Sequence, residues 1–323
     1  KLNLISELKE ICDKEKIEKI IVGLPIGLSG EDTQTTELVK EFIDEKRNYI
    51  RPKTHDRYTN HFIPFQEFIN TYFPDASRDI SLIDAHHIKE CVDYLAEKRS
   101  EQKWEAETIN RMIQMVSSLF IYAIKRKYRV DNPTVDVRKL PVLQKDSPEY
   151  FSYEELKKIW EEVDPFWLPA FQFLYYTGIR KGEMINLTWD KVNLTNKPPY
   201  IRIVSSSDWK TKTGKARMLH LHKKAIKIIK NQIGLHPKYV FISKVGNQVH
   251  PNTPYNSLKR ALNRLKLTGD VHKLRHTFAS HLVMKGANVY DVQNQLGHSK
   301  IEMTMKYSHL SPEHNQSVVN LLK

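Results

Sequence analysis

Apolar residues recur at intervals of three and four over much of the chain, and this spacing commits those stretches to amphipathic helices. Two helices are predicted at about 53–72 and 84–98, and Pro64 is expected to kink or interrupt the first. The clearest helical stretch covers about 105–127, and its apolar face carries Ile109, Met112, Val116, Leu119, Phe120 and Ala123. Residues 47–140 are therefore predicted to form an all-helical domain.

The helical pattern resumes at residue 152, but a short β segment interrupts it. Ser152 and Glu155 have the spacing of a capping box, which marks the start of a helix. Strands are predicted at 200–204, 217–221 and 240–242, and a polar hairpin loop joins the first two. This part of the chain is expected to combine helices with a small antiparallel β-sheet.

Two further changes of pattern divide the chain. Residues 141–150 carry two prolines and several charges without periodicity, as a linker does, so a second domain is predicted at 151–323. Residues 1–46 have the pattern of a helix, a buried strand, a loop and a second helix. This short α/β fragment has too few residues to form a core by itself. The whole chain is thus predicted to be mainly α, with the all-helical domain at 47–140 between the fragment and the linker.

The charge is unevenly distributed. The chain has 51 Lys and Arg against 38 Asp and Glu, a formal net charge of +13. Residues 1–46 have a net charge of −4, so residues 47–323 carry +17. Such an excess indicates a polyanionic partner, most often nucleic acid, with solubility alone as the alternative. A basic run at the end of the helix predicted at about 105–127 supplies candidate contacts to a DNA backbone, with a solvated helix end as the alternative: Lys125, Arg126, Lys127 and Arg129.

Composition excludes other classes of protein. No apolar run approaches the roughly 18 residues that a membrane-spanning helix needs, so no membrane is expected as a partner. Cys12 and Cys91 lie far apart, which argues against a disulfide scaffold and favours a reducing compartment. A cytoplasmic location is therefore expected.

Four short segments of the second domain carry residues that can act on a phosphate. In the first, Arg180 follows a glycine at a predicted helix junction, where its planar guanidinium can face a phosphate and Glu183 can hold it. Taken alone, this pair fits an ordinary surface Arg–Glu pair better. In the second segment, His272 and Arg275 are neighbours on one helix face, which suits acid–base chemistry beside a phosphate.

His276 follows His272 by four residues, a spacing that also occurs in metal sites. The zinc-protease pattern requires a glutamate after the first histidine, whereas this chain has Lys273, so no metal site is predicted. His276 is interpreted instead as a packed or capping residue. The third segment projects His298 from a glycine-capped turn. The fourth offers Tyr307, whose phenol needs nearby cations to act as a nucleophile and which alone reads as a half-buried helix tyrosine.

The order and spacing of the four segments carry more information than any one of them. TGIRKGE at 177–183, HKLRH at 272–276 and LGH at 296–298, followed nine residues later by Tyr307, resemble the boxes of the tyrosine recombinase (phage integrase) family. The resemblance covers about residues 47–323. It implies that the helical domain is a SAM-like core-binding domain and that the second domain is catalytic.

The resemblance implies a mechanism as well. A tyrosine attacks a DNA phosphodiester to form a 3′-phosphotyrosyl bond and a free 5′-hydroxyl, and a partner strand's 5′-hydroxyl reverses the step. The covalent link conserves the bond energy, so neither ATP, a metal nor another cofactor is implied. The roles fall on matching residues: Tyr307 as nucleophile, Arg180 and Arg275 as phosphate clamp, Lys212 as acid for the leaving oxygen, His272 as an aid to proton transfer, His298 as a phosphate contact and Glu183 as structural support. Lys210 and Lys215, on the same loop, are the alternatives to Lys212.

The implied partners are a double-stranded DNA recombination site and further copies of the protein. Cuts on two duplexes require a tetramer on DNA, either a homotetramer or a heterotetramer with a paralogue. Residues 312–322 resemble the terminal helix that relatives donate to a neighbouring subunit, with packing in the same subunit as the alternative. Xer-like resolution of DNA dimers and integration of a mobile element both fit.

Other functions fit parts of the pattern. A type IB topoisomerase-like enzyme would form the same tyrosine adduct but relax supercoils without strand exchange. A non-catalytic DNA-binding protein with this fold is disfavoured by the full set of candidate catalytic residues. Residues 4–46 resemble the C-terminal part of the RuvX/YqgF RNase H-like family without its early catalytic aspartate, so no nuclease activity is predicted. A fusion remnant, a misjoined reading frame and part of a longer fusion stay open for residues 1–46.

Overall fold

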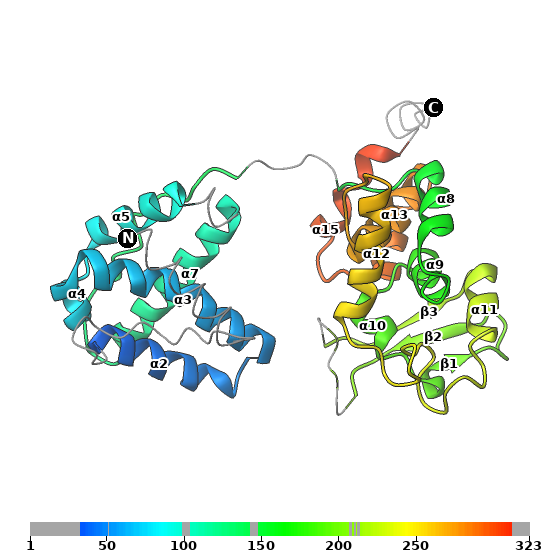
Figure 1. Ribbon diagram of the computed structural model, residues 1–323, viewed down its shortest axis with the longest axis horizontal. Helices are drawn as coiled ribbons and strands as arrows, with labels where there is room; N and C mark the ends of the chain where they lie inside the picture. The colour runs from blue at the N-terminus through cyan, green and yellow to red at the C-terminus, as the bar shows by residue number, and fades with distance from the viewer. Residues whose placement is uncertain are drawn as a thin grey trace, which may run out of the picture. The chain divides into compact units, whose positions relative to one another are not determined.

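The chain divides into two compact units, residues 1–144 and residues 145–323, called here the N-terminal and the C-terminal unit (Figure 1). Each unit has a hydrophobic core of its own. The computed structural model describes residues 33–50, 52–98, 104–142, 148–206, 209, 211 and 214–311.

The N-terminal unit is built around the long helix α3. Its elements are α2 (Gln34–Arg47), α3 (Pro52–Tyr72), α4 (Pro74–Arg78), the 3-10 helix η1 (Ile80–Leu82), α5 (Ala85–Glu97) and α7 (Ala106–Lys125). Helix α3 contacts α2, α4, α5 and α7. The apolar face predicted for 105–127 is buried along α7, from Ile109 to Ala123. The three helices expected from spacing are therefore present as α3, α5 and α7.

Pro64 lies inside α3 without ending it. Its neighbours Phe62 and Phe65 are buried in the core of the unit. This packing stabilises the helix on both sides of the proline, although the proline cannot donate a backbone hydrogen bond. The expected interruption is wrong, because α3 continues to Tyr72, while the expected kink stays a prediction.

Helix α2 is part of the same core, which differs from the predicted boundary at residue 46. The buried residues Leu38, Val39, Phe42 and Ile43 of α2 join the core of the N-terminal unit. The Phe42 ring packs edge-on against Phe62 of α3 and Tyr122 of α7, with centroids 5.9 and 5.4 Å apart. Residues 33–46 therefore belong to the helical unit, because the apolar face of α2 packs against α3, α4 and α7. The rest of the RuvX-like segment lies outside the described residues.

The C-terminal unit combines helices with a small sheet. Its helices are α8 (Tyr153–Glu162), α9 (Leu168–Thr177), α10 (Lys181–Ile185), η2 (Trp189–Lys191), α11 (Lys223–Lys230), α12 (Asn252–Arg264), α13 (Val271–Met284), α14 (Val289–Leu296), α15 (Glu302–Met305) and η3 (Ser308–Leu310). Helices α9 and α13 pack against each other in the middle of the unit. The predicted capping box at the start of α8 is confirmed. Ser152 Oγ accepts a hydrogen bond from the backbone nitrogen of Glu155, and the Glu155 carboxylate accepts one from the backbone nitrogen of Ser152. None of the helices in the described ranges is long and apolar enough to cross a membrane.

The sheet is antiparallel, with the order β1 (Val192–Asn193), β2 (Tyr200–Ile203) and β3 (Arg217–His220). The two strands predicted around the hairpin are present, and Ile201 of β2 lies opposite Leu219 of β3. The strand predicted at 240–242 is wrong. Val240 and Phe241 are buried, but the backbone makes isolated bridges instead of a ladder, one at Tyr239 with Thr188 and one at Ile242 with Gln248. A buried apolar triplet has the same pattern whether or not its backbone finds a partner strand.

Candidate active site

A glycine turn at the end of α9 positions the first arginine of the site. Gly178 has a φ of +64°, a left-handed conformation, and a Cβ there would lie 2.3 Å from Phe278 Cδ1. Both facts require glycine. The turn delivers Arg180 to the position before α10, where its side chain lies beside that of Glu183.

Glu183 is the acid that ties this region together, and it is 2% exposed. It accepts hydrogen bonds from the backbone nitrogen of Arg180 at 2.8 Å and from Arg180 Nη1 at 3.1 Å. Arg217, on β3, donates Nη1 and Nη2 to the two carboxylate oxygens at 2.9 and 2.6 Å. Burial raises the pKa of Glu183, but the hydrogen bonds and charges of Arg217 and Arg180 outweigh it, so the net pKa is lowered. Glu183 is thus a charged structural residue.

The LGH turn packs directly on Arg217. Gly297 ends α14 with a φ of +68°, and a Cβ there would lie 2.7 Å from Arg217 Cδ. The same turn carries His298. Arg217 therefore connects Glu183 on one side with the His298 turn on the other, and a movement of either would disturb both.

Arg275 lies in the interior of this cluster and is 2% exposed. Its Nη1 donates to the Gly178 carbonyl at 2.6 Å and its Nη2 to the Leu296 carbonyl at 2.8 Å. Burial lowers the pKa of Arg275 to about 9, and the charge of Arg180 adds to this shift. Arg217 acts on this pKa in the same direction as Arg180, and Glu183 acts against both, so the site gathers three guanidinium groups around one buried carboxylate. It is therefore suited to an anion such as a phosphodiester.

Two histidines of the site are held neutral. Burial lowers the pKa of His272 to about 4 and that of His298 to about 3, with further contributions from neighbouring cations that include Arg275 and Arg180. The His272 backbone is fixed at the start of α13 by the Asp270 carboxylate at 2.7 Å. His298 Nδ1 is hydrogen-bonded to Thr304 Oγ1 at 2.9 Å, which orients its ring. A bound anion would offset the positive field and ease protonation of both rings.

Tyr307 lies directly before η3 and is 2% exposed. Its hydroxyl is hydrogen-bonded to Nδ1 of His276 at 2.6 Å. Burial raises the pKa of Tyr307 to about 12, while Arg275 acts to lower it. The phenol is therefore protonated at neutral pH.

The structure brings most of the predicted site residues together. Those that it groups are Arg180, Glu183, His272, Arg275, His298 and Tyr307. Lys212 and its alternative Lys210 lie outside the described residues, and the other alternative, Lys215, is exposed. Thr211, between the two lysines, is buried, and its backbone nitrogen bonds Ser205 Oγ at 3.1 Å.

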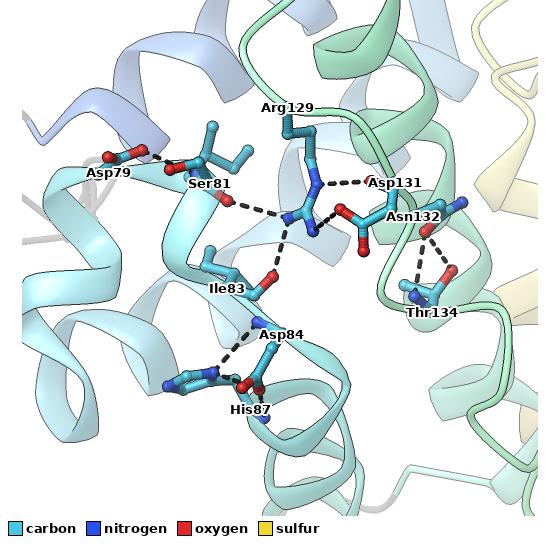
Figure 2. A network of polar contacts seen from close by, with 10 residues as sticks. Asp79, Ser81, Ile83, Asp84, His87, Arg129, Asp131, Asn132 and Thr134 are labelled. Atoms are coloured by element: carbon cyan, nitrogen blue, oxygen red, sulfur yellow. Dashed lines mark hydrogen bonds and ion pairs between the residues drawn. The ribbon is translucent and has the colours of Figure 1, made fainter.

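Arg129, predicted as a DNA contact, has a different role. It is 8% exposed, and its Nη1 donates to the carbonyls of Ile80 and Ile83 at 3.0 and 2.8 Å (Figure 2). Its Nε and Nη2 bond the Asp131 carbonyl and carboxylate. The guanidinium is thus a structural clamp inside the N-terminal unit. The other members of the run, Lys125, Arg126 and Lys127, are exposed, and Arg126 pairs with Glu45 at 2.9 Å.

Three residues that contact the predicted site residues cannot be identified from the sequence pattern: Arg217, Thr304 and His276. Arg217 follows the glycine loop as one of several basic residues, and no local pattern distinguishes it. Thr304 lies six residues beyond its partner His298. The interpretation of His276 as a packed residue misses its contact with Tyr307, although its place four residues after His272 puts both histidines on one helix face.

Two family models match this architecture. The model of the phage integrase family matches residues 150–314, and the model of the phage integrase SAM-like domain matches residues 35–138. The predicted SAM-like domain is confirmed by the second match. That match begins inside α2, in agreement with the packing of this helix in the N-terminal unit.

Two tyrosine recombinases align with this chain over most of their own length. A tyrosine recombinase of Thermosipho africanus is 31% identical over 222 residues, which cover 67% of this chain and 76% of the relative. Tyrosine recombinase XerD of Staphylococcus aureus is 28% identical over 258 residues, which cover 75% of this chain and 83% of XerD.

Solved structures share the fold. Residues 82–397 of the Tn1549 transposon integrase, in complex with circular intermediate DNA, have a TM-score of 0.71 at 17% identity, over 90% of this chain and 100% of that solved chain. The XerH site-specific recombinase bound to difH has a TM-score of 0.64 at 20% identity, over 88% of this chain and 83% of the XerH chain. The predicted fold, a SAM-like domain followed by a recombinase domain, is confirmed by these likenesses. Taken with the family matches and the T. africanus relative, they show that the chain belongs to the phage integrase family, the tyrosine site-specific recombinases.

Proposed function

We propose that Tyr307 is the nucleophile with which this recombinase cleaves and rejoins DNA. The observation that carries the proposal is the position of the buried Tyr307 hydroxyl, which is hydrogen-bonded to His276 and lies in the field of the buried Arg275. Arg275 lies close enough to lower the pKa of Tyr307 against the effect of burial. Attack by Tyr307 Oη on phosphorus would form a 3′-phosphotyrosyl bond and release a 5′-hydroxyl. Attack by the 5′-hydroxyl of a partner strand would reverse the step.

Arg180 and Arg275 are proposed to bind the nonbridging oxygens of the phosphate. Both guanidinium groups are already held by Glu183 or by backbone carbonyls, so little reorganisation is needed when charge develops in the transition state. His298, fixed by Thr304, would add a hydrogen bond to the same oxygens. These charges would perform the neutralising work of a metal ion, so the proposed reaction needs none.

The leaving 5′-oxygen requires a proton, and Lys212 is proposed to supply it. Its neighbour in sequence supports this role, because Thr211 is buried and its backbone N–H donates to Ser205 Oγ, two residues after β2. Together with the covalent tyrosine link, a proton donor of this kind allows rejoining without ATP.

The proposed DNA partner is a duplex recombination site. The Tn1549 integrase and XerH were both solved with DNA, which supports the same class of ligand here. The exposed Lys125, Arg126 and Lys127 at the end of α7 are proposed as backbone contacts of the N-terminal unit. Both XerD and a transposon integrase are among the similar proteins, so dimer resolution and mobile-element integration are equally supported.

We further propose that the protein assembles as a tetramer on DNA through its C-terminal segment. The C-terminal unit contains a groove with a volume of about 830 Å³. Its apolar lining includes Tyr153, Trp160, Tyr175, Phe278 and Leu282, and lysines lie at its edge. The apolar residues Val318, Val319, Leu321 and Leu322 of a neighbouring copy match such a groove in character. Replacement of Leu321 and Leu322 by serine is expected to abolish tetramers on DNA, measured by crosslinking, without abolishing binding of a single copy.

A covalent trapping experiment tests the proposed chemistry. Nicked duplexes from the DNA that flanks the gene are incubated with the protein in EDTA, so that a short fragment diffuses away after cleavage. A protein–DNA band that survives SDS is expected for the wild type and not for Tyr307→Phe. An adduct that requires Mg²⁺, or that persists in Tyr307→Phe, would overturn the proposal. Relaxation of supercoiled plasmid without joined recombinant products would support the topoisomerase-like alternative.

A further inference from the structure

The contact of the Tyr307 hydroxyl raises a question that the family resemblance does not answer. His272 is the histidine that the resemblance assigns to proton transfer. The hydrogen bond of the Tyr307 hydroxyl goes instead to Nδ1 of His276, at 2.6 Å. The ring of His272 packs perpendicular to that of His276, with centroids 4.8 Å apart. His276 is therefore the imidazole in direct contact with the reacting atom.

The geometry suits proton transfer. A general base must lie within about 2.6–3.2 Å of the atom whose proton it takes, and Nδ1 of His276 meets this condition before DNA is bound. The rings of His276 and Tyr307 are tilted by 41° with centroids 6.0 Å apart, so they meet through their polar atoms rather than by stacking. His276 lies on α13 beside Arg275, so base and clamp share one helix.

The electrostatic surroundings keep this histidine neutral. Burial lowers the pKa of His276, and the charges of Arg275 and Lys306 add to the effect, while Asp270 opposes it. His272 is the other titratable ring in contact with it. A neutral imidazole with its proton on Nε2 presents a lone pair at Nδ1, which is the form that a base requires.

We propose that His276 is the general base for the Tyr307 nucleophile. As the bond from Tyr307 Oη to phosphorus forms, the phenol proton moves to His276 Nδ1, and the bond from phosphorus to the 5′-oxygen breaks. On rejoining, His276 returns the proton to the departing phenolate. His272 then acts as a positioning residue that packs against the base. This inference rests on the proposed role of Tyr307.

The test separates the nucleophile side of the reaction from the leaving-group side. Single-turnover adduct formation is measured on an ordinary duplex and on one whose scissile 5′-bridging oxygen is sulfur, because a thiolate leaves without a proton. His276→Ala is expected to lose on the order of 10²-fold in rate on both substrates, as loss of a general base does. The rate of adduct formation by Lys212→Ala is expected to be low on the ordinary duplex and to return towards the wild-type rate on the sulfur-substituted duplex. Recovery of His276→Ala on that substrate would overturn the assignment.

His276→Gln distinguishes a base from a packing residue. Glutamine can hydrogen-bond the phenol but cannot take its proton, so its rate is expected to stay low at pH 7. It should then rise about tenfold per pH unit above pH 7, because phenolate must form first. A Gln rate within about threefold of the wild type, with an unchanged pH profile, would show that His276 only positions Tyr307 and would overturn the inference.

A matched control lies in the same unit, among residues that line neither the candidate site nor the groove. His236 Nδ1 accepts hydrogen bonds from the backbone nitrogens of Lys238 and Tyr239 at 2.9 and 3.0 Å. His236→Gln tests whether loss of a hydrogen-bonded histidine reduces the rate through folding alone, and it should retain near wild-type cleavage. Absence of any adduct in the wild type would contradict the proposed role of Tyr307, and the inference with it. An adduct that forms normally in His276→Ala would contradict the inference alone.

Discussion

Arg217 holds Glu183 by both carboxylate oxygens, although the two residues are 34 positions apart and lie on β3 and α10. The pair links the small sheet to the turn that carries Arg180. Because Gly297 packs on the same arginine, the pair also supports the turn that carries His298. A salt bridge outside the proposed chemistry thus determines the position of two groups inside it.

Replacement of Arg217 by alanine should damage both stability and cleavage. Glu183 would keep a buried charge without its strongest partner, which costs about 3 kcal/mol of unfolding free energy. Arg180 would lose the support of a fixed carboxylate, so adduct formation should fall as well. Urea unfolding followed by tryptophan fluorescence reports mainly on the C-terminal unit, which holds Trp160, Trp167, Trp189 and Trp209 of the five tryptophans. Arg202→Ala, an exposed arginine on the neighbouring strand, is the control and should change neither quantity.

Gly178→Ala should destabilise the C-terminal unit more than an equivalent change elsewhere. Both the positive φ and the contact with Phe278 oppose a side chain there, for a combined cost of about 3 kcal/mol. Gly234 also has a positive φ, +87°, but nothing lies within 4 Å of a Cβ there. Gly234→Ala should therefore cost about 1 kcal/mol, from the backbone alone. Equal costs in urea unfolding would show that the close approach to Phe278 is unimportant.

The stability of the C-terminal unit should fall as the pH drops below about 6.5. The pKa values of His272 and His298 in the folded state, about 4 and about 3, lie below the ordinary value of 6.5. Between about pH 6.5 and pH 4 the unfolded chain therefore binds more protons than the folded protein does. The free energy of unfolding that is present above pH 6.5 is lost progressively as the pH falls through this range. His272→Gln should reduce the slope of stability against pH. The exposed His250, changed to Gln, should leave it unaltered, and equal slopes for all three proteins would refute the explanation.

Arg129→Ala should weaken the N-terminal unit without removing a DNA contact. The Ile80 and Ile83 carbonyls would lose their donor, which costs about 3 kcal/mol for two buried acceptors and a lost clamp. Faster hydrogen exchange in α5 and α7 would report this loss. Lys125→Ala should have the opposite effects. Hydrogen exchange in α5 and α7 should stay as in the wild type, while DNA affinity and its dependence on salt should both fall. A selective loss of DNA affinity in folded Arg129→Ala would restore the role predicted from the sequence.

Periodicity identified the helices that bury a continuous apolar face, such as α7, and the hairpin around β2 and β3. It could not show that α2 completes the core of the N-terminal unit, because an apolar stripe does not name the surface that it covers. It could not exclude a strand at 240–242 either. Strand formation depends on a backbone partner, which local sequence does not specify.

In the candidate site, too, some residues could be predicted from local sequence and others depend on contacts between distant segments. Arg180, Glu183, Arg275 and Tyr307 could be found because their spacing forms recognisable boxes. Arg217 and His276 could not, since their importance arises from contacts across the fold: Arg217 with Glu183, and His276 with Tyr307. Interactions between distant segments create the site, and the boxes only indicate where to look.

The central claim is that Tyr307 becomes covalently joined to DNA, and mass spectrometry of the trapped adduct tests it most directly. Trypsin cleaves after Lys306, so the peptide 307–323 begins with Tyr307 and contains no other tyrosine. After nuclease digestion this peptide should carry a nucleotide joined through phosphate to the tyrosine oxygen. A nucleotide on any other peptide, or none on this one while the covalent band is present, would contradict the claim.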